Sequence, residues 1–210
     1  HGYLDRNELE NVLQPLRVGF TNGLQRMAYT ESHDEERVMY ELKQRGFAGT
    51  ERENRAILSL ALTLTAPGTA MMYSGQEFGE FTRKLVGENP LQWSLMETEP
   101  GKRIFDATRK LVRLRTTNPA LQRGDITFLH HNQPEGMTAY RRNADDQSVI
   151  VAANFGRGAN TMDVLFEGTW SNLLTGSNFK ESGEFTRSVA LQPGEVAVFV
   201  KRSNDGAKAP

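Results

Sequence analysis

Residues 67–77 have the sequence PGTAMMYSGQE, in which a helix-ending Pro-Gly pair is followed by an apolar run and then by polar residues. Pro67 and Gly68 end a preceding helix, because proline lacks an amide donor and glycine readily leaves helical geometry. The unbroken apolar run that follows predicts a strand buried on both faces, as in a parallel sheet. From Ser74 to Glu77 the chain turns polar. We therefore expect a parallel strand with polar groups at its carboxyl end.

The sequence upstream of this strand alternates in type. A helix is predicted over 52–65, and because it is apolar around most of its circumference it must be buried on more than one side. Residues 26–30 have strand character and lead into the polar residues 31–34. The opening segment predicts a helix with one apolar face and with Asp5 or Asn7 as its cap; that face holds Leu9, Val12, Leu13 and Leu16.

Downstream, residues 102–115 predict an amphipathic helix whose charged outer face we interpret as a solvated surface. After Asn118-Pro119 the pattern changes to short alternating runs separated by turn residues, which is typical of an antiparallel sandwich. We place the boundary near 121–124. The expected domains are 1–121, the C-terminal portion of a (β/α)8 barrel, and 122–203, a β-sandwich, with 204–210 a disordered tail.

The fold class is thus α/β followed by all-β. Alternating strands and helices favour a parallel architecture, but two parallel strands do not form a stable sheet by themselves. The other strands must come from upstream sequence or from another chain. Because the first residue is His1 and no leader pattern follows it, we expect the chain to begin inside a longer protein, and its localisation stays open.

Composition excludes several classes of protein. The net charge is -1, with 25 basic and 26 acidic residues, which is unlike a nucleic-acid binder. The longest apolar stretch, 56–66, is far shorter than the roughly 20 residues that cross a bilayer. Without cysteine there is no disulfide framework and no zinc-thiolate site.

The sharpest chemical feature is Ser32-His33-Asp34, directly after a predicted strand. In parallel barrels, side chains at the carboxyl ends of strands line the active site. A histidine beside an aspartate there can bind sugar hydroxyls through directional hydrogen bonds. The plainer interpretation is a turn in which the aspartate caps the next helix, and the two roles are compatible.

Several segments together resemble the alpha-amylase family of glycoside hydrolases. Residues 29–34 (YTESHD) resemble the family's fourth conserved region, and 67–77 its eighth-strand segment. Residues 89–93 (NPLQW) and the helix ending at 111–115 are similar to the run into the last barrel helix. Two departures from the family pattern leave the subfamily undetermined. Ser32 replaces the usual asparagine, as in branching-type members, and Thr69-Ala70 replaces the usual x-Pro.

The resemblance implies a retaining mechanism on α-1,4- or α-1,6-linked glucans, with a nucleophile, an acid and a third carboxylate that supports the transition state. By position, Asp34 matches the third carboxylate and His33 the hydroxyl-binding histidine. The nucleophile and the acid belong to strands absent from this chain, so we expect the chain alone to be inactive. The implied partners are an α-glucan or maltooligosaccharide and the N-terminal half of the same barrel. We expect no cofactor and no metal ligands in this chain, and calcium dependence stays open.

Other residues have weaker functional patterns. Gln76 and Glu77 suit structural or rim roles, and Tyr73 is expected to pack. Trp93 suits either a sugar platform or a lid over the core. His130 and His131 are adjacent on a strand and face opposite ways, so they cannot both bind one metal. No phosphate loop, zinc spacing or acidic calcium loop occurs.

Two further functions stay open beside the enzyme fragment. One is a non-catalytic amylase homologue acting as a carbohydrate-binding or scaffold subunit, although retention of His33 and Asp34 argues against it. The other is a separate carbohydrate-binding sandwich with an α/β appendage. Within the enzyme interpretation, hydrolysis and branching are not distinguished.

Overall fold

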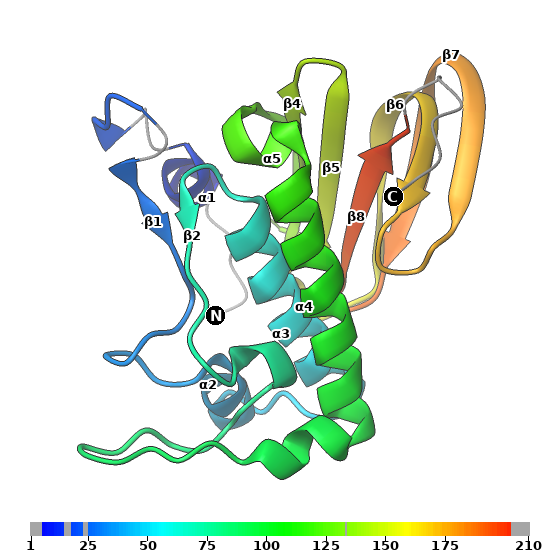
Figure 1. Ribbon diagram of the computed structural model, residues 1–210. Coiled ribbons are helices and arrows are strands. Elements are labelled where there is room, and N and C mark those ends of the chain that lie inside the picture. Colours follow the sequence, from blue (N-terminus) through cyan, green and yellow to red (C-terminus); the bar gives the residue numbers. More distant parts are fainter. Residues whose placement is uncertain (1–5, 15–17, 23–24, 133, 203–210) are drawn as a thin grey trace.

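The computed structural model describes residues 6–14, 18–22, 25–132 and 134–202 (Figure 1). The proposed cap Asp5, the helix-face residue Leu16 and the tail 204–210 lie outside these ranges. The helices are α1 (Arg6–Leu13), α2 (Val38–Gln44), α3 (Gly49–Thr65), α4 (Glu99–Thr117) and α5 (Pro119–Arg123), with 3-10 turns at Gln76–Phe78 and Trp93–Glu97. Asn7, the other candidate cap, lies within α1.

Two short strands, β1 (Met27–Ala28) and β2 (Thr69–Ala70), lie side by side and run parallel. Met27 is paired with Thr69, and the amide of Met71 donates to the carbonyl of Ala28 at 2.9 Å. This confirms the predicted parallel pairing, although the regular ladder is shorter than the predicted runs. The carboxyl ends of both strands point toward the lower part of Figure 1.

Helices α3 and α4 pack together beside the two strands. The predicted apolar stripe of α4 is buried at Ile104, Ala107, Leu111 and Leu114. Helix α4 begins earlier than predicted because the Thr98 hydroxyl accepts from the amide of Gly101 at 3.1 Å and caps it. Helix α3 ends at Thr65, directly before the Ala66-Pro67 bend, as the sequence predicted.

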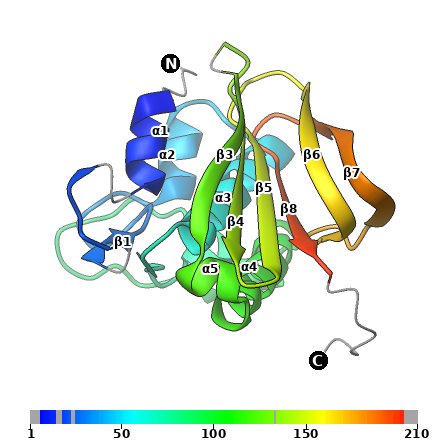
Figure 2. The ribbon, with the colours of Figure 1, turned by 90° about the horizontal axis from the view of Figure 1, so that it is seen from above.

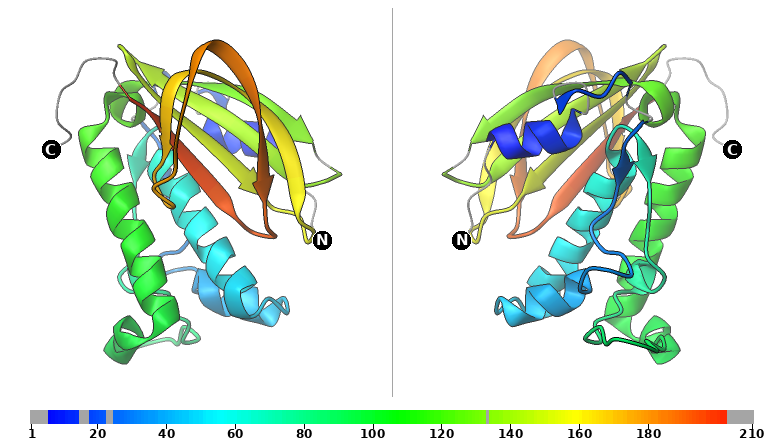
Figure 3. Two further views of the ribbon diagram at one scale, coloured as in Figure 1. Left: turned by 90° about the vertical axis from the view of Figure 1, so that its right-hand side faces the viewer. Right: turned by 90° about the vertical axis from the view of Figure 1, so that its left-hand side faces the viewer.

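The second part is one antiparallel sheet of six strands in the order β3-β4-β5-β8-β6-β7. Its strands are β3 (Asp125–Asn132), β4 (Met137–Ala144), β5 (Gln147–Asn154), β6 (Asn160–Asn172), β7 (Asn178–Leu191) and β8 (Val196–Lys201). The long β6–β7 hairpin curls across the other strands (Figures 1 and 3). The sheet therefore encloses a core of its own, as in the expected sandwich.

Side-chain alternation explains how the sheet serves two cores. Tyr140, Val151 and Val198 face the helices and join the core formed by α3 and α4. The intervening residues face the opposite side, where Ile150 and Phe199 pack with the aromatic rings of β6. The view from above shows the helices on one side of this sheet and the β6–β7 hairpin on the other (Figure 2).

Candidate functional site

His33 and Asp34 lie just beyond the carboxyl end of β1. The amide of Asp34 donates to the hydroxyl of Ser32 at 3.0 Å, and His33 Nε2 lies 3.3 Å from Asp34 Oδ2. Both side chains are open to solvent, with exposed fractions of 80 % and 77 %. Helix α2 begins at Val38 after Arg37, so Asp34 does not cap it. The turn thus presents both polar groups outward.

The exposed turn rests on a buried ion pair. Arg37 Nη1 lies 3.2 Å from Glu31 Oε1 and also donates to the carbonyl of Ser74 at 2.6 Å. The amide of Val38 donates to the other oxygen of Glu31 at 2.6 Å. Arg37 also lies over the ring of Tyr73, 4.2 Å from its centroid. Arg37 therefore ties the loop after β1 to the loop after β2.

Burial raises the pKa of Glu31 above its ordinary value, because water no longer stabilises the carboxylate. The Val38 amide and the Arg37 guanidinium act in the opposite direction, while the nearby carboxylate of Glu77 adds to the increase. Sequence patterns did not single out Glu31 or Arg37, because no local pattern of residues indicates that these two charged side chains are buried.

Gln76 and Glu77 shape the backbone beyond β2. Gln76 Nε2 donates to the hydroxyl of Thr30 at 2.8 Å and links the two strand ends. Glu77 Oε2 accepts from the amide of Gly75 at 2.8 Å. These contacts fit the structural roles expected for both residues. Gly75 has φ of 96° and lies so close to Glu80 and Leu91 that no side chain fits there.

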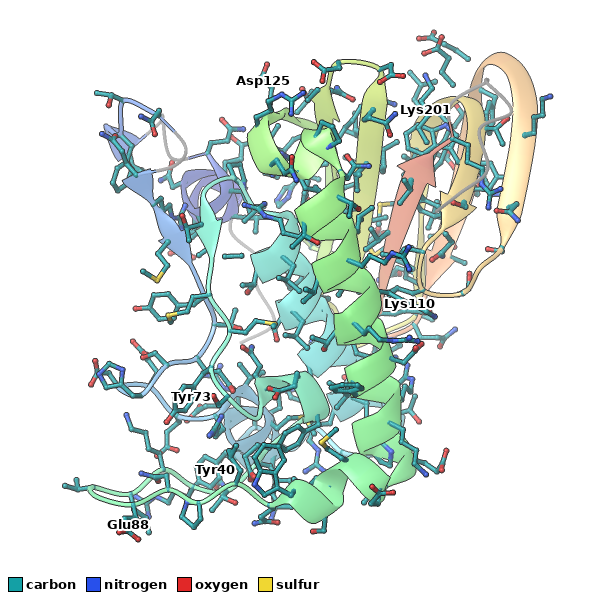
Figure 4. The ribbon with its side chains drawn as sticks, in the orientation of Figure 1. Tyr40, Tyr73, Glu88, Lys110, Asp125 and Lys201 are labelled. Atoms are coloured by element: carbon teal, nitrogen blue, oxygen red, sulfur yellow. The ribbon has the colours of Figure 1, made fainter. Side chains whose placement is uncertain are left out.

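A cavity of about 540 Å³ lies at this end of the molecule. His33, Asp34, Glu36 and Tyr73 form one side of it. The other side is the loop after β2, through residues 84–87 and Asn89. Figure 4 shows Tyr73 at this end and Glu88 on the loop that projects from the body. The sequence indicated His33 and Asp34 but gave no sign that this loop lies opposite them.

The remaining candidates lie elsewhere. Trp93 is exposed, its ring centroid is 5.6 Å from that of Phe78, and it does not line the cavity. His130 and His131 are in β3, at the edge of the sheet. No group of three or more potential metal-binding side chains occurs in the described part of the chain. Within the same ranges, no helix is long and apolar enough to cross a membrane.

A second cavity, of about 480 Å³, lies between α4 and the sheet. Lys110 of α4 and Arg187 and Phe179 of β7 are among its lining residues. Lys110 is paired with Asp106 at 2.9 Å, and Arg187 lies over the ring of Phe179. None of the site residues predicted from sequence lines this cavity, so it is separate from the candidate site.

Several curated proteins are similar to this chain in sequence. No family model matches the chain. Alpha-amylase MalA of Haloarcula japonica is 26 % identical over 193 residues, covering 90 % of this chain and 26 % of that protein. A cyclomaltodextrinase of Geobacillus thermopakistaniensis is 28 % identical over 74 % of this chain and 26 % of its own length. The 1,4-alpha-glucan branching enzyme of Nitrosomonas europaea is 32 % identical over 61 % of this chain and 19 % of its own length.

Solved structures show the same fold. The gamma-CGTase from alkalophilic Bacillus clarkii has a TM-score of 0.75 at 21 % identity, over 96 % of this chain and 30 % of that one. An Anoxybacillus pullulanase complexed with maltotetraose has a TM-score of 0.74 at 16 % identity, over 92 % and 30 %.

The fold is therefore the C-terminal part of a (β/α)8 barrel followed by an antiparallel β-domain. The similar proteins and structures all indicate the alpha-amylase family of glycoside hydrolases. The chain spans about a quarter of the length of the first two curated relatives.

Proposed function

We propose that this chain supplies one carboxylate, Asp34, and one sugar-binding histidine, His33, to the active site of a retaining α-glucan-active enzyme. The observation that carries the proposal is the exposure of both side chains in one cavity at the carboxyl end of a parallel strand. Such strand ends are where parallel barrels form their active sites.

The chemistry fits the two groups. Glycoside cleavage passes through an oxocarbenium-like transition state that carries positive charge on the sugar ring. The carboxylate of Asp34 can stabilise that charge, and His33 can hydrogen-bond to a sugar hydroxyl. The nucleophile and the acid would come from other barrel strands. On this proposal the isolated chain cleaves no maltooligosaccharide.

The proposed protein partner is the N-terminal half of the same barrel. Among the described residues β1 pairs with β2 alone, which leaves its other edge open. Met27 and Tyr29, on and just after β1, are both exposed. An open strand edge with exposed apolar side chains is suited to pairing with a further strand. We propose that the barrel ends and the β-domain begins within 121–124, where α5 ends before β3.

The proposed ligand is an α-glucan or maltooligosaccharide. The similar pullulanase structure contains maltotetraose, and the curated relatives include a cyclomaltodextrinase and a glucan branching enzyme. These relatives support a glucan ligand for the cavity beside Asp34. A non-catalytic carbohydrate-binding subunit is the alternative, and it would bind the same ligand without turnover.

Substitution of Asp34 tests the proposal. In a protein that joins this chain to the complementary barrel strands, Asp34→Asn should lower kcat on maltoheptaose by at least about a hundredfold, because charge stabilisation is lost. The free energy of unfolding should change by less than about 0.5 kcal/mol, because Asp34 is mostly exposed.

Asp146→Asn, on the exposed β4–β5 turn, is the matched control and should leave kcat unchanged. An Asp34→Asn enzyme with wild-type turnover would show that the assigned role is wrong. A wild-type complex that binds maltoheptaose but never cleaves it would favour the non-catalytic subunit.

A further inference from the structure

The loop opposite Asp34, residues 82–91, is held in place without regular secondary structure. We call it the clamped loop. At its base, the buried carboxylate of Glu80 accepts from the amides of Phe81 and Thr82, both at 2.9 Å. The other oxygen of Glu80 accepts from the amide of Gln92 at 2.6 Å. One carboxylate therefore joins the two ends of the loop.

A side chain also closes the tip. Asn89 Oδ1 accepts from the amide of Leu85 at 2.7 Å, and its Nδ2 donates to the carbonyls of Leu85 and Gly87, both at 2.9 Å. Gly87 has φ of 110°, a backbone conformation that other residues rarely adopt. Three hydrogen bonds from one amide side chain thus fix the turn at 85–89.

Glu36 connects the clamped loop to the Asp34 turn. Its Oε2 accepts from the amide of Lys84 at 3.0 Å, and its Oε1 lies 3.9 Å from Nε of Arg83. Glu36 is two residues from Asp34 in the chain. The spacing between the loop and the catalytic candidate is therefore set by one side chain.

The loop presents apolar groups to water. Leu85 has an exposed fraction of 60 %, and Val86 is wholly exposed. Both line the cavity that contains His33 and Asp34, together with Lys84 and Asn89. Exposed apolar side chains on a fixed loop add nothing to folding, since they remove no apolar area from water. Their placement is explained if a ligand covers them.

Such a ligand must be apolar on one surface and rich in hydroxyls at its edge. The pyranose rings of a glucan present C–H groups on their faces and hydroxyls around their rims. Leu85 and Val86 can pack against the C–H faces, while His33, Asp34 and Lys84 offer hydrogen-bonding groups for the hydroxyls.

We propose that the clamped loop is a glucan-binding wall of the Asp34 cavity, with Leu85 and Val86 as the contact residues and Glu36 as the positioning residue. The inference rests on the proposed function and adds to it the part of the chain that selects an extended glucan. It requires no change of structure, because the loop is already fixed at its base and its tip.

Titration of the whole chain with maltotriose tests the wall. Amide resonances in NMR spectra report binding even when it is weak. The double variant Leu85→Ser, Val86→Ser should raise the Kd for maltotriose by about tenfold, because two apolar contacts are lost. Leu165→Ser, an exposed leucine on β6 away from the cavity, is the matched control and should leave the Kd unchanged.

A second pair of variants tests the positioning role of Glu36. Glu36→Ala should weaken maltotriose binding several-fold and speed hydrogen exchange of the Lys84 amide, since its acceptor is removed. Glu36→Gln keeps an oxygen acceptor and should restore both. A general loss of stability would also speed hydrogen exchange in α4. Rescue by glutamine together with unchanged exchange in α4 would therefore indicate a positioning role for Glu36 and not a general loss of stability.

The outcomes distinguish the two proposals. If the double variant binds maltotriose as tightly as wild type while His33→Ala weakens binding, the wall is overturned and the proposed function stands. The Leu85-Val86 tip would then be a surface for another polypeptide segment. If wild type shows no maltotriose-dependent shifts at tens of millimolar, the wall is overturned, whereas the turnover of the joined protein and of its Asp34→Asn variant decides the proposed function separately.

Discussion

At the scale of single residues, the buried ion pair beneath the Asp34 turn has the clearest energetic consequence. Arg37→Met would leave the carboxylate of Glu31 buried without a cation. Removing one partner of a buried pair costs about 3–5 kcal/mol, so we expect a loss of that size at neutral pH. Urea unfolding measures it. Arg45→Met, which breaks the exposed Arg45–Glu41 pair, should cost under about 0.5 kcal/mol.

The same variant should show a defined pH dependence. Burial already raises the pKa of Glu31, and removing Arg37 raises it further. A group whose pKa is raised in the folded state contributes stability below its unfolded pKa and loses it as pH increases. The deficit of Arg37→Met should therefore shrink as pH falls into the ordinary range of glutamate. A deficit that is constant from pH 8 to pH 4.5 would contradict this explanation.

At the scale of elements, the Glu80 clamp is the feature to test. Burial by itself would raise the pKa of Glu80, but hydrogen bonds from Gln92, Thr82 and Phe81 outweigh it and hold that pKa below its ordinary value. We expect Glu80→Gln to lower the free energy of unfolding by about 1–3 kcal/mol at pH 7, because charge-assisted hydrogen bonds are lost. Urea unfolding of both proteins gives the difference.

The pKa of Glu80 is shifted in the direction opposite to that of Glu31. A carboxylate with a lowered pKa contributes stability above its unfolded pKa and loses it as pH falls through its folded pKa. The difference between wild type and Glu80→Gln should therefore be constant at neutral pH and disappear in acid. Glu88→Gln, at the exposed loop tip, is the control and should differ by under about 0.5 kcal/mol at any pH. A difference in the free energy of unfolding that persists in acid would rule out a role for the negative charge of Glu80.

The elements also show what sequence patterns can predict. Helices α3 and α4 were predicted because long apolar stripes repeat over several turns. Helices α2 and α5 were missed because seven and five residues give too little periodicity. Strand β7 was missed because its sequence, NFKESGEFTRSVAL, is mostly polar, and the pairing with β6 stabilises it.

For the molecule as a whole, one part of the candidate site could be predicted from the sequence and another part could not. His33 and Asp34 form a local motif, so the sequence located them directly. The opposite side of the cavity depends on Glu36 meeting the amide of Lys84, 48 residues away. The ion pair under the turn likewise depends on burial that arises only after folding. Contacts between distant segments leave no periodic signal in the sequence.

Polar contacts of Tyr140 and Arg142 are among those that join the helical part to the sheet. The hydroxyls of Tyr140 and Thr65 lie 2.6 Å apart, and burial raises the pKa of Tyr140 to about 12. The buried guanidinium of Arg142 donates to the carbonyls of Thr65 at 2.5 Å and of Gly124 at 2.7 Å. One apolar core also runs through α3, α4 and the facing side of the sheet. Parts that share a core in this way unfold together.

We therefore expect one cooperative transition for the whole chain. Trp93→Phe leaves Trp170, which is buried in the sheet, as the one remaining tryptophan. Its fluorescence reports the sheet, while circular dichroism at 222 nm reports the helices, and the two urea midpoints should coincide. Arg142→Leu should lower both midpoints together, by a free energy of about 2–4 kcal/mol, because buried carbonyls lose their donor. A lower urea midpoint from circular dichroism than from Trp170 fluorescence would show instead that the sheet is stable without the helices.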